Sequence, residues 1–153
     1  DLAKVTRSHH GFFGNFSGSI DLVDDQIEAS SVRVEITMSS VQTDEDRLTT
    51  HLKSPDLLDV EKFPKATFVS TSIQKSTDGK RTHLVTGDFE LHGVRKSIQL
   101  PADIRVQTGS VEADGEFSFK RQDFGVVYPG MPDDLIKDDV LIRLKIRAAP
   151  DAV

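Results

Sequence analysis

The sequence predicts an all-β protein, an antiparallel barrel of about eight strands with a short helical insertion around residues 44–60. Two observations indicate the strands. Hydrophobic and polar residues alternate with period two in several runs, most clearly at 32–39. Turn signals separate these runs, including Asp-Gly at 78–79 and His-Gly at 92–93. A third observation indicates the insertion, because the alternation stops at residue 43 and hydrophobic residues then follow a helical spacing.

The N-terminal part of the chain is expected to form three strands. Residues 2–7 fit a short strand, and a turn follows at 8–11. Residues 12–20 form an aromatic-rich strand that two glycines interrupt. Glycine inside a strand marks a bulge or bend of the kind that a closed barrel needs at its corners. A turn at 24–25 leads to the alternating strand at 32–39.

The stretch 44–60 carries two helix-start signals. Thr43 can cap a helix, and Asp46 follows three residues later, as in a capping box. Ser-Pro-Asp at 54–56 is a second start signal, because Ser can cap and Pro tolerates the first helical position. Pro64 ends any helix, since the residue before a proline avoids the helical region. We therefore expect a short helical plug, residues 51–68, to carry apolar side chains between strands.

The rest of the chain returns to strands. They are expected at 66–73, 82–91, 94–106, 111–119 and 140–146. Pro101 lies inside the third of these, so we expect an edge strand, a bulge or a weakened ladder there. Residues 124–139 form the longest irregular segment, and long loops in compact domains are often functional lids or packed caps.

Composition narrows the class of protein. The chain has 153 residues with 37% hydrophobic and 29% charged residues, which is typical of one globular domain, 1–153. Its net charge of −6 disfavours binding to nucleic acid, which needs a basic face. It has no cysteine, and so no disulfide, thiolate nucleophile or Cys-based metal site. No apolar run approaches the roughly 20 residues of a transmembrane helix.

Catalytic and metal-binding patterns are weak. Of the five histidines, His9 and His10 are adjacent and point to opposite faces of an extended segment, and no HExxH spacing is present. His51 and His92 lie beside predicted turns, where an imidazole can hold the backbone by a hydrogen bond. No Gly-x-Ser-x-Gly motif occurs and no triad can be assigned from spacing. We therefore expect no catalytic residue, no metal ligand and no cofactor.

Several motifs, in a fixed order, carry a family resemblance. They are Phe16-Ser17-Gly18-Ser19-Ile20, Ser40-Val41-Gln42-Thr43, the stretch 51–68 with Ser54-Pro55-Asp56 and Phe63-Pro64, Gly87-Asp88 with His92-Gly93-Val94, and Arg121 with Asp123-Phe124-Gly125. With the final alternating strand, these motifs resemble those of the YceI-like family, named for a bacterial periplasmic protein. The chain departs from the family pattern at Leu57-Leu58, where two phenylalanines are usual, and its first strand is shorter.

The resemblance implies a lipocalin-like barrel that binds a long isoprenoid lipid, such as a polyprenyl quinone or a polyprenyl phosphate, for transport, storage or protection. It also implies a periplasmic or secreted protein. A shortened first strand would expose a strand edge, so a homodimer is a further expectation. The alternatives are a barrel enzyme of unknown reaction acting on a small apolar substrate, and a structural module without a ligand.

The expected ligand-binding residues are the apolar side chains that face the barrel interior or belong to the plug. They are Phe12, Phe16, Val34, Ile36, Met38, Leu57, Leu58, Phe63, Phe68, Phe89, Phe117, Phe119 and Ile142. A polyprenyl chain has no hydrogen-bonding groups, so it needs only a dry apolar tunnel, in which each buried CH₂ contributes about 0.8 kcal/mol. The inward-facing residues of a filled barrel core and of a barrel with a ligand tunnel have the same alternating pattern, and a filled core is the commoner of the two. Alternation alone therefore favours a filled core, and only the family resemblance favours a tunnel.

Two further interpretations stay open. The plug is either a cap that seals one end of the barrel or a mobile gate, with Leu57, Leu58 and Phe63 at the tunnel mouth. Arg121 lies near the long loop, where its guanidinium can pair with a phosphate or quinone oxygen or, more simply, with an acid such as Asp123.

Overall fold

The computed structural model describes residues 11–24, 26–55, 57–126 and 139–149. The strands in this part are β1 (Gly11–Phe13), β2 (Phe16–Val23), β3 (Gln26–Thr37), β4 (Val41–Thr43), β5 (Lys65–Lys75), β6 (His83–Leu91), β7 (Val94–Gln107), β8 (Ser110–Lys120) and β9 (Asp139–Ala148). The helices are α2 (Asp46–Lys53) and two short 3-10 helices, η1 (Met38–Ser40) and η2 (Arg121–Phe124). The strand predicted at 2–7 and most of the loop predicted at 124–139 lie outside the described residues.

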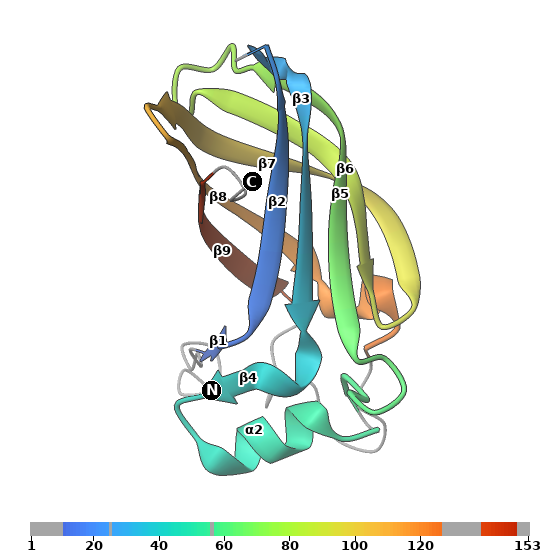
Figure 1. Ribbon diagram of the computed structural model, residues 1–153. Coiled ribbons are helices and arrows are strands. Elements are labelled where there is room, and N and C mark those ends of the chain that lie inside the picture. The colour runs from blue at the N-terminus through green and yellow to red at the C-terminus, as the bar shows by residue number, and fades with distance from the viewer. Residues whose placement is uncertain (1–10, 25, 56, 127–138, 150–153) are drawn as a thin grey trace.

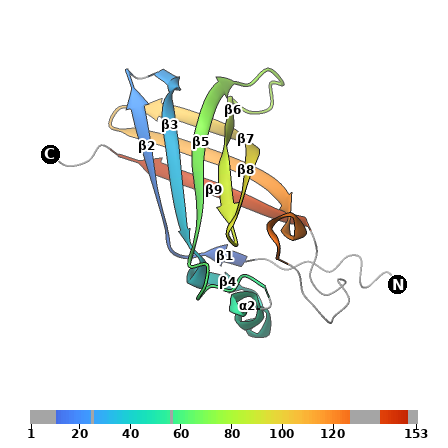
Figure 2. The same cartoon turned by 90° about the vertical axis from the view of Figure 1, so that its right-hand side faces the viewer.

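A seven-stranded antiparallel sheet dominates the fold, in the order β2-β3-β5-β6-β7-β8-β9. It curls into a half-barrel, with β7, β8 and β9 crossing behind β2, β3 and β5 (Figures 1 and 2). The predicted all-β, lipocalin-like class is therefore confirmed. The strand predicted at 12–20 is divided at Gly14 and Asn15 into β1, which pairs with β4 in a separate small sheet, and β2.

The two edge strands of the half-barrel, β2 and β9, lie next to each other but do not pair within the described residues. Seven consecutive antiparallel neighbours leave the first and last strands running in the same direction, so no antiparallel ladder can close the sheet. We call this boundary the seam. The side chain of Ile146 of β9 reaches the backbone of β2, since a Cβ placed on Gly18 would lie 3.6 Å from its Cδ1.

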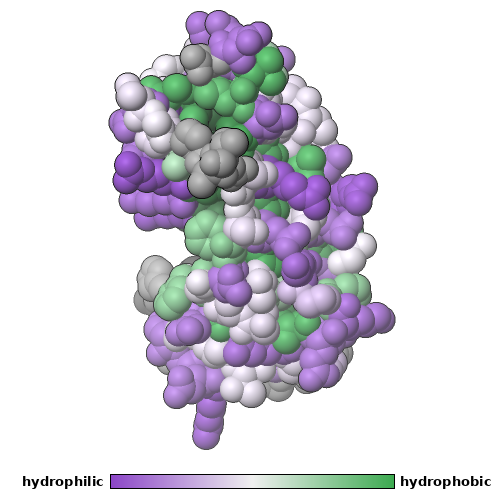
Figure 3. Space-filling view, in the orientation of Figure 1, coloured by the Kyte–Doolittle hydropathy of each residue, from purple (hydrophilic) through white to green (hydrophobic). Residues whose placement is uncertain are grey.

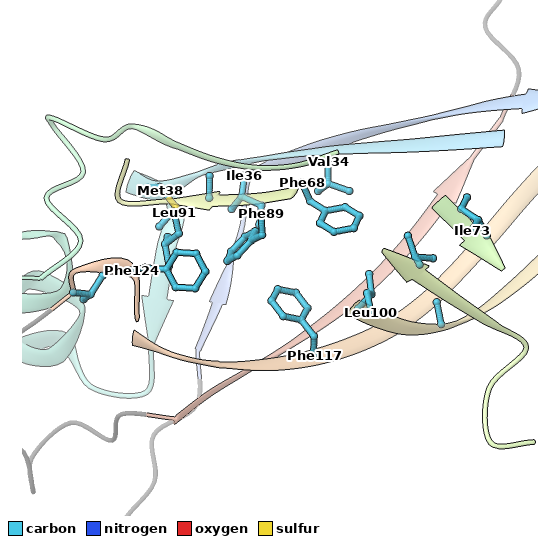
Figure 4. Packing of buried hydrophobic residues seen from close by; sticks show 14 of the residues in the cluster. Val34, Ile36, Met38, Phe68, Ile73, Phe89, Leu91, Leu100, Phe117 and Phe124 are labelled. Atoms are coloured by element: carbon cyan, nitrogen blue, oxygen red, sulfur yellow. The ribbon is translucent and has the colours of Figure 1, made fainter. Parts of the chain in front are cut away.

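The core lies on the concave inner face of the sheet (Figure 4). Strand β6 alternates strictly, with His83, Val85, Gly87, Phe89 and Leu91 buried and the residues between them half-buried. The inner faces predicted for β3, β7 and β8 follow the same pattern. Period-two patterning therefore identified the inner face correctly along most of the sheet.

The helical insertion is confirmed, but neither predicted start signal caps a helix. The N-cap of α2 is Glu45, without a side-chain cap hydrogen bond, and not Thr43. Helix α2 ends at Lys53, and Ser54 is its C-cap, not the N-cap of a second helix. Residues 54–55 and 57–62 lie in hydrogen-bonded turns instead, in which Leu57 N–H donates to the Ser54 carbonyl at 3.1 Å. Ser54 has extended backbone angles, as expected for a residue that precedes a proline.

Pro101 lies in β7, a central strand, so the edge-strand alternative is wrong. The ladder between β7 and β8 covers Ala102 to Gln107 and stops next to Pro101, while the ladder to β6 continues through it. Because proline has no N–H to donate, it marks the point where pairing with β8 ends, which is the weakened ladder that the sequence predicts.

Candidate functional site

The inner face of the half-barrel is the candidate site, and its two ends differ. Four phenylalanines pack together at the end near α2, which we call the aromatic end. Phe89 contacts Phe117 and Phe124 with ring centroids 5.2 and 5.4 Å apart, and Phe119 lies 5.2 Å from Phe124. These three contacts are close to edge-to-face, a favourable arrangement for aromatic pairs. Rings from β6, β8 and η2 thus interlock and fill this end (Figure 4).

The opposite end is lined by aliphatic side chains, and we call it the aliphatic end. It holds a cavity of about 10 Å³. The cavity is lined by Ile20, Leu22, Ile27, Ser30, Val32, Ile73, Ile104, Val111 and Ala113. Such a volume is room for about one water molecule. An isoprenoid chain therefore does not fit this cavity in the conformation seen here.

The plug closes the aromatic end from below. Leu57 is 1% exposed and belongs to the core, whereas Leu58 and Phe63 are half-buried. The ring of Phe63 packs against His92 with centroids 4.5 Å apart, and it covers Gly93 so closely that a Cβ there would lie 2.8 Å from Cε1. These contacts support the cap interpretation, while gating by the plug stays a prediction.

His92 has the structural role that the sequence suggested. Its Nδ1 lies 3.2 Å from the carbonyl oxygen of Phe124, and since a carbonyl only accepts, Nδ1–H is the donor. His92 and Gly93 both have positive φ angles, 56° and 76°, as a two-residue hairpin turn between β6 and β7 requires. The imidazole thus ties this turn to η2.

Most of the predicted ligand-binding residues lie together on the inner face or in the plug. Val34, Ile36, Met38, Leu57, Phe68, Phe89 and Phe117 are buried. Leu58, Phe119 and Ile142 are half-buried against the same core, and Phe63 is half-buried against His92 and Gly93. Which of these side chains contacts a ligand stays a prediction.

Phe16 and Phe12 lie elsewhere. Phe16 pairs with Ile36 and so shares its inner face, but at the seam it is 45% exposed. Phe12 is 59% exposed and pairs with Gln42 in the small sheet, so it does not line the interior. Its neighbour Phe13 packs against the core instead, because the break after β1 changes the register of the alternation.

The predicted ligand-binding set left out many inner residues, including every side chain that lines the cavity at the aliphatic end. Phe124, His83 and Arg121 are three further examples. Phe124 is 1% exposed at the end of η2, where no period-two pattern could reveal it. His83 is 7% exposed on β6, and extending the alternation of β6 backwards would have placed it on the inner face. Arg121 is 3% exposed, and its Nη1 donates a hydrogen bond to the backbone carbonyl of Val126 at 2.8 Å.

Charged pairs lie away from the inner face. Arg95 pairs with Glu90 and Arg105 with Glu112, both at 3.2 Å. On β3, a hydrogen bond from Lys65 lowers the pKa of Glu35. Within the described ranges, no group of three or more His, Cys, Asp or Glu side chains is placed to hold a metal ion. In the same residues, no helix is long and apolar enough to cross a membrane.

Comparison with known proteins identifies the family. The model of the YceI-like domain matches residues 2–148. The chain belongs to the YceI-like family. A UPF0312 protein of Pseudomonas savastanoi pv. phaseolicola is 36% identical over 137 residues, which cover 86% of this chain and 70% of that protein. A UPF0312 protein of Yersinia enterocolitica is 33% identical over 125 residues, which cover 76% of this chain and 62% of that protein.

Solved structures of the YceI-like fold agree with the half-barrel. The YceI protein of Campylobacter jejuni superimposes with a TM-score of 0.80 at 25% identity, covering 94% of this chain and 85% of that one. BcnA of Burkholderia cenocepacia superimposes with a TM-score of 0.77 at 23% identity, covering 91% of this chain and 87% of that one. A domain of Saccharophagus degradans described as polyisoprenoid-binding superimposes with a TM-score of 0.66 at 18% identity, covering 92% of this chain and 85% of that one. At these identities, the last two support the fold alone.

Proposed function

We propose that this protein binds a long apolar isoprenoid lipid on the inner face of the half-barrel and acts as an exported carrier, store or protective container, not as an enzyme. One observation carries the proposal: an almost entirely apolar inner face is enclosed by a sheet with one unpaired seam. Membership of the YceI-like family supports it. So does the polyisoprenoid-binding description of the structurally similar Saccharophagus degradans domain.

The seam is the expected route for the ligand. Separating β2 from β9 breaks no backbone ladder in the described residues, whereas opening any other boundary of the sheet breaks one. Hydrophobic groups reach the surface along the upper part of this boundary in Figure 3, and a notch lies between its lower part and the small sheet. Phe16 and Val23, both on β2, are 45% and 42% exposed. Apolar groups at an opening give a lipid its first contacts.

The packed interior requires that the half-barrel expand when it binds. Ligand methylenes replace contacts between side chains, so the net gain is smaller than the about 0.8 kcal/mol per CH₂ of transfer from water. The aliphatic end is where expansion costs least, because its lining has a cavity and no interlocked rings.

The test is mass spectrometry of an organic extract of the purified protein, followed by binding of added polyprenyl quinone to the delipidated protein. The proposal expects a co-purified isoprenoid, saturable binding of about one ligand per chain, and ligand recovered with unchanged mass. A changed ligand mass would indicate an enzyme. If the extract holds no isoprenoid and the delipidated protein binds none, the inner face is only a core and the protein is a structural module.

A further inference from the structure

The ladder between β3 and β5 covers only the half of these strands near the aromatic end. Toward the aliphatic end it stops at the pair Arg33 and Val69. Residues 26–32 of β3 and 70–75 of β5 continue beyond this pair, and their ladders join them only to β2 and to β6. Figure 2 shows β3 and β5 diverging toward this end. We call this divergence the fork, and it can widen while the ladder below it stays intact.

A β-bulge in β5 lies at the point where the two strands separate. In the pairing of β5 with β6, the register shifts between Ser70 and Ser72, so Thr71 is the extra residue. Its hydroxyl donates to the carbonyl of Thr86 at 3.2 Å. A bulge bends its strand and can end pairing with a neighbour. The bulge therefore accounts for the end of the ladder between β5 and β3.

Two side-chain contacts span the fork in the described part of the chain. At its base, the backbone N–H of Val32 donates to Oγ of Ser70 at 2.8 Å, and this bond is partly buried. At its tip, Nζ of Lys75 lies 3.8 Å from Glu28, with side chains 81% and 37% exposed. A solvated ion pair of this kind contributes little. The hydroxyl of Ser70 is thus the stronger link across the fork.

The cavity at the aliphatic end lies behind the fork. Ile27, Ser30 and Val32 of β3 and Ile73 of β5 belong to its lining. Ser30 is the one polar residue of that lining, and its hydroxyl already accepts the N–H of Val23 at 2.9 Å and donates to the carbonyl of residue 26 at 2.6 Å. The lining therefore offers a ligand no free side-chain donor. A polar head group would lose its hydrogen bonds to water there, whereas a hydrocarbon would lose none.

We propose that the fork widens when the isoprenoid binds, that the tail end of the ligand fills the enlarged cavity behind it, and that the Ser70 hydroxyl is the latch that limits the widening. This inference rests on the proposed function and deepens it. It places the tail end, and not the head group, at the aliphatic end. It also makes Ser70 a residue that determines tail-length specificity, because only a long tail reaches the cavity and needs the fork to open.

The test measures the affinities of two polyprenyl quinones with the same head group, one with a short and one with a long tail, for the wild type and Ser70→Ala. Without the hydroxyl, Val32 N–H loses its partner in the closed fork, so widening costs less. Ser70→Ala should bind the long-tailed quinone about threefold to tenfold more tightly, the equivalent of one neutral hydrogen bond, and the short-tailed quinone unchanged. Ser97→Ala, which removes an exposed hydroxyl from β7, is the matched control and should change neither affinity.

A tether across the fork should have the opposite effect. The chain has no cysteine, so Glu28→Cys with Lys75→Cys introduces the only two thiols, at the positions of the exposed ion pair. Joining them with a short bismaleimide should weaken binding of the long-tailed quinone and leave the short-tailed quinone unchanged. The same protein blocked with a monomaleimide should bind both as the wild type does.

A further readout is hydrogen exchange of the Val32 amide, followed by NMR. The long-tailed quinone should accelerate this exchange in the wild type, and the short-tailed quinone should not. The inference is overturned if Ser70→Ala weakens or does not change binding of the long tail, if it changes both tails alike, or if the tether leaves the long tail unaffected. Failure of the proposed function is distinct, because the wild type would then bind neither quinone.

Discussion

The two ends of the inner face have the same strands but different packing. At the aromatic end, rings from β6, β8 and η2 interlock, and the plug covers them with the fully buried Leu57. At the aliphatic end, branched side chains surround a cavity of about 10 Å³, and the buried His83 begins β6. Large rings that interlock fix a single arrangement, whereas shorter side chains beside a void can rearrange at lower cost.

This difference suggests a division of roles within one sheet. The aromatic end holds the curl of the half-barrel together, while the aliphatic end and the seam supply the freedom to admit a ligand. A stability defect and a binding defect should therefore result from substitutions at different places. The predictions below test that separation.

The largest effect is expected from locking the seam. The chain has no cysteine, so Gly18→Cys with Ile146→Cys introduces the only two thiols, on facing positions of β2 and β9. A short bismaleimide that joins them should abolish or greatly slow the uptake of a polyprenyl quinone, followed by its fluorescence or by extraction. Each single-cysteine protein, blocked with a monomaleimide, should take up the ligand normally. Unchanged uptake by the cross-linked protein would place the route elsewhere.

The aromatic end should dominate stability. Phe89 is 2% exposed and contacts three other rings, so Phe89→Ala is expected to lower the free energy of unfolding by about 3–5 kcal/mol. The matched control is Phe12→Ala, which removes a ring that is 59% exposed and should change stability by less than about 0.5 kcal/mol. Urea unfolding measures both. Similar losses in the two variants would contradict the packing described here.

These residues also show how far the sequence could be interpreted. Alternation located Phe89, Phe117 and the rest of the inner face because the strand period is a local property. It failed for Phe12, because the break after β1 shifts which residues face inward, and for Phe124, which lies in a 3-10 turn. No local pattern could reveal that Ser54 ends a helix, since Ser-Pro also fits a helix start. The closeness of the seam and the pairing of Thr82 with His83 depend on contacts that exist only in the folded sheet.

Between the two ends, Gly87 makes room for the ring of Phe68. A Cβ there would lie 2.5 Å from the carbonyl oxygen of Val69 and 2.6 Å from Cζ of Phe68. The carbonyl belongs to the paired strand β5 and cannot move away, so Gly87→Ala should cost about 1–3 kcal/mol, measured by urea unfolding. Gly14→Ala is the control, because its nearest atom would be 3.7 Å away. Equal stability of the two variants would show that β5 and the ring of Phe68 can shift at little cost to accommodate a Cβ at residue 87.

The smallest effects are expected on the outer surface, where the ends should behave alike. Near the aromatic end, the hydrogen bond from Lys65 lowers the pKa of Glu35, and at the aliphatic end the backbone N–H of Lys80, with the hydroxyl of Ser76, lowers the pKa of Asp78. A carboxylate whose pKa is lower in the folded state stabilises the fold above its unfolded pKa and loses that contribution as the pH falls through the folded value. Glu35→Gln and Asp78→Asn should therefore each lower Tm slightly at pH 7 and not at acidic pH.

High salt should shrink the Glu35→Gln effect further, since solvent screens an exposed ion pair. Thermal unfolding from pH 7 down to pH 2, with and without salt, measures these differences. A large loss from either variant, or a loss that persists after the carboxylates are protonated, would mean that the outer face also distinguishes the two ends. If both effects are small and vanish in acid, the contrast between a rigid end and an adaptable end belongs to the inner face, where the rings, the cavity and His83 lie.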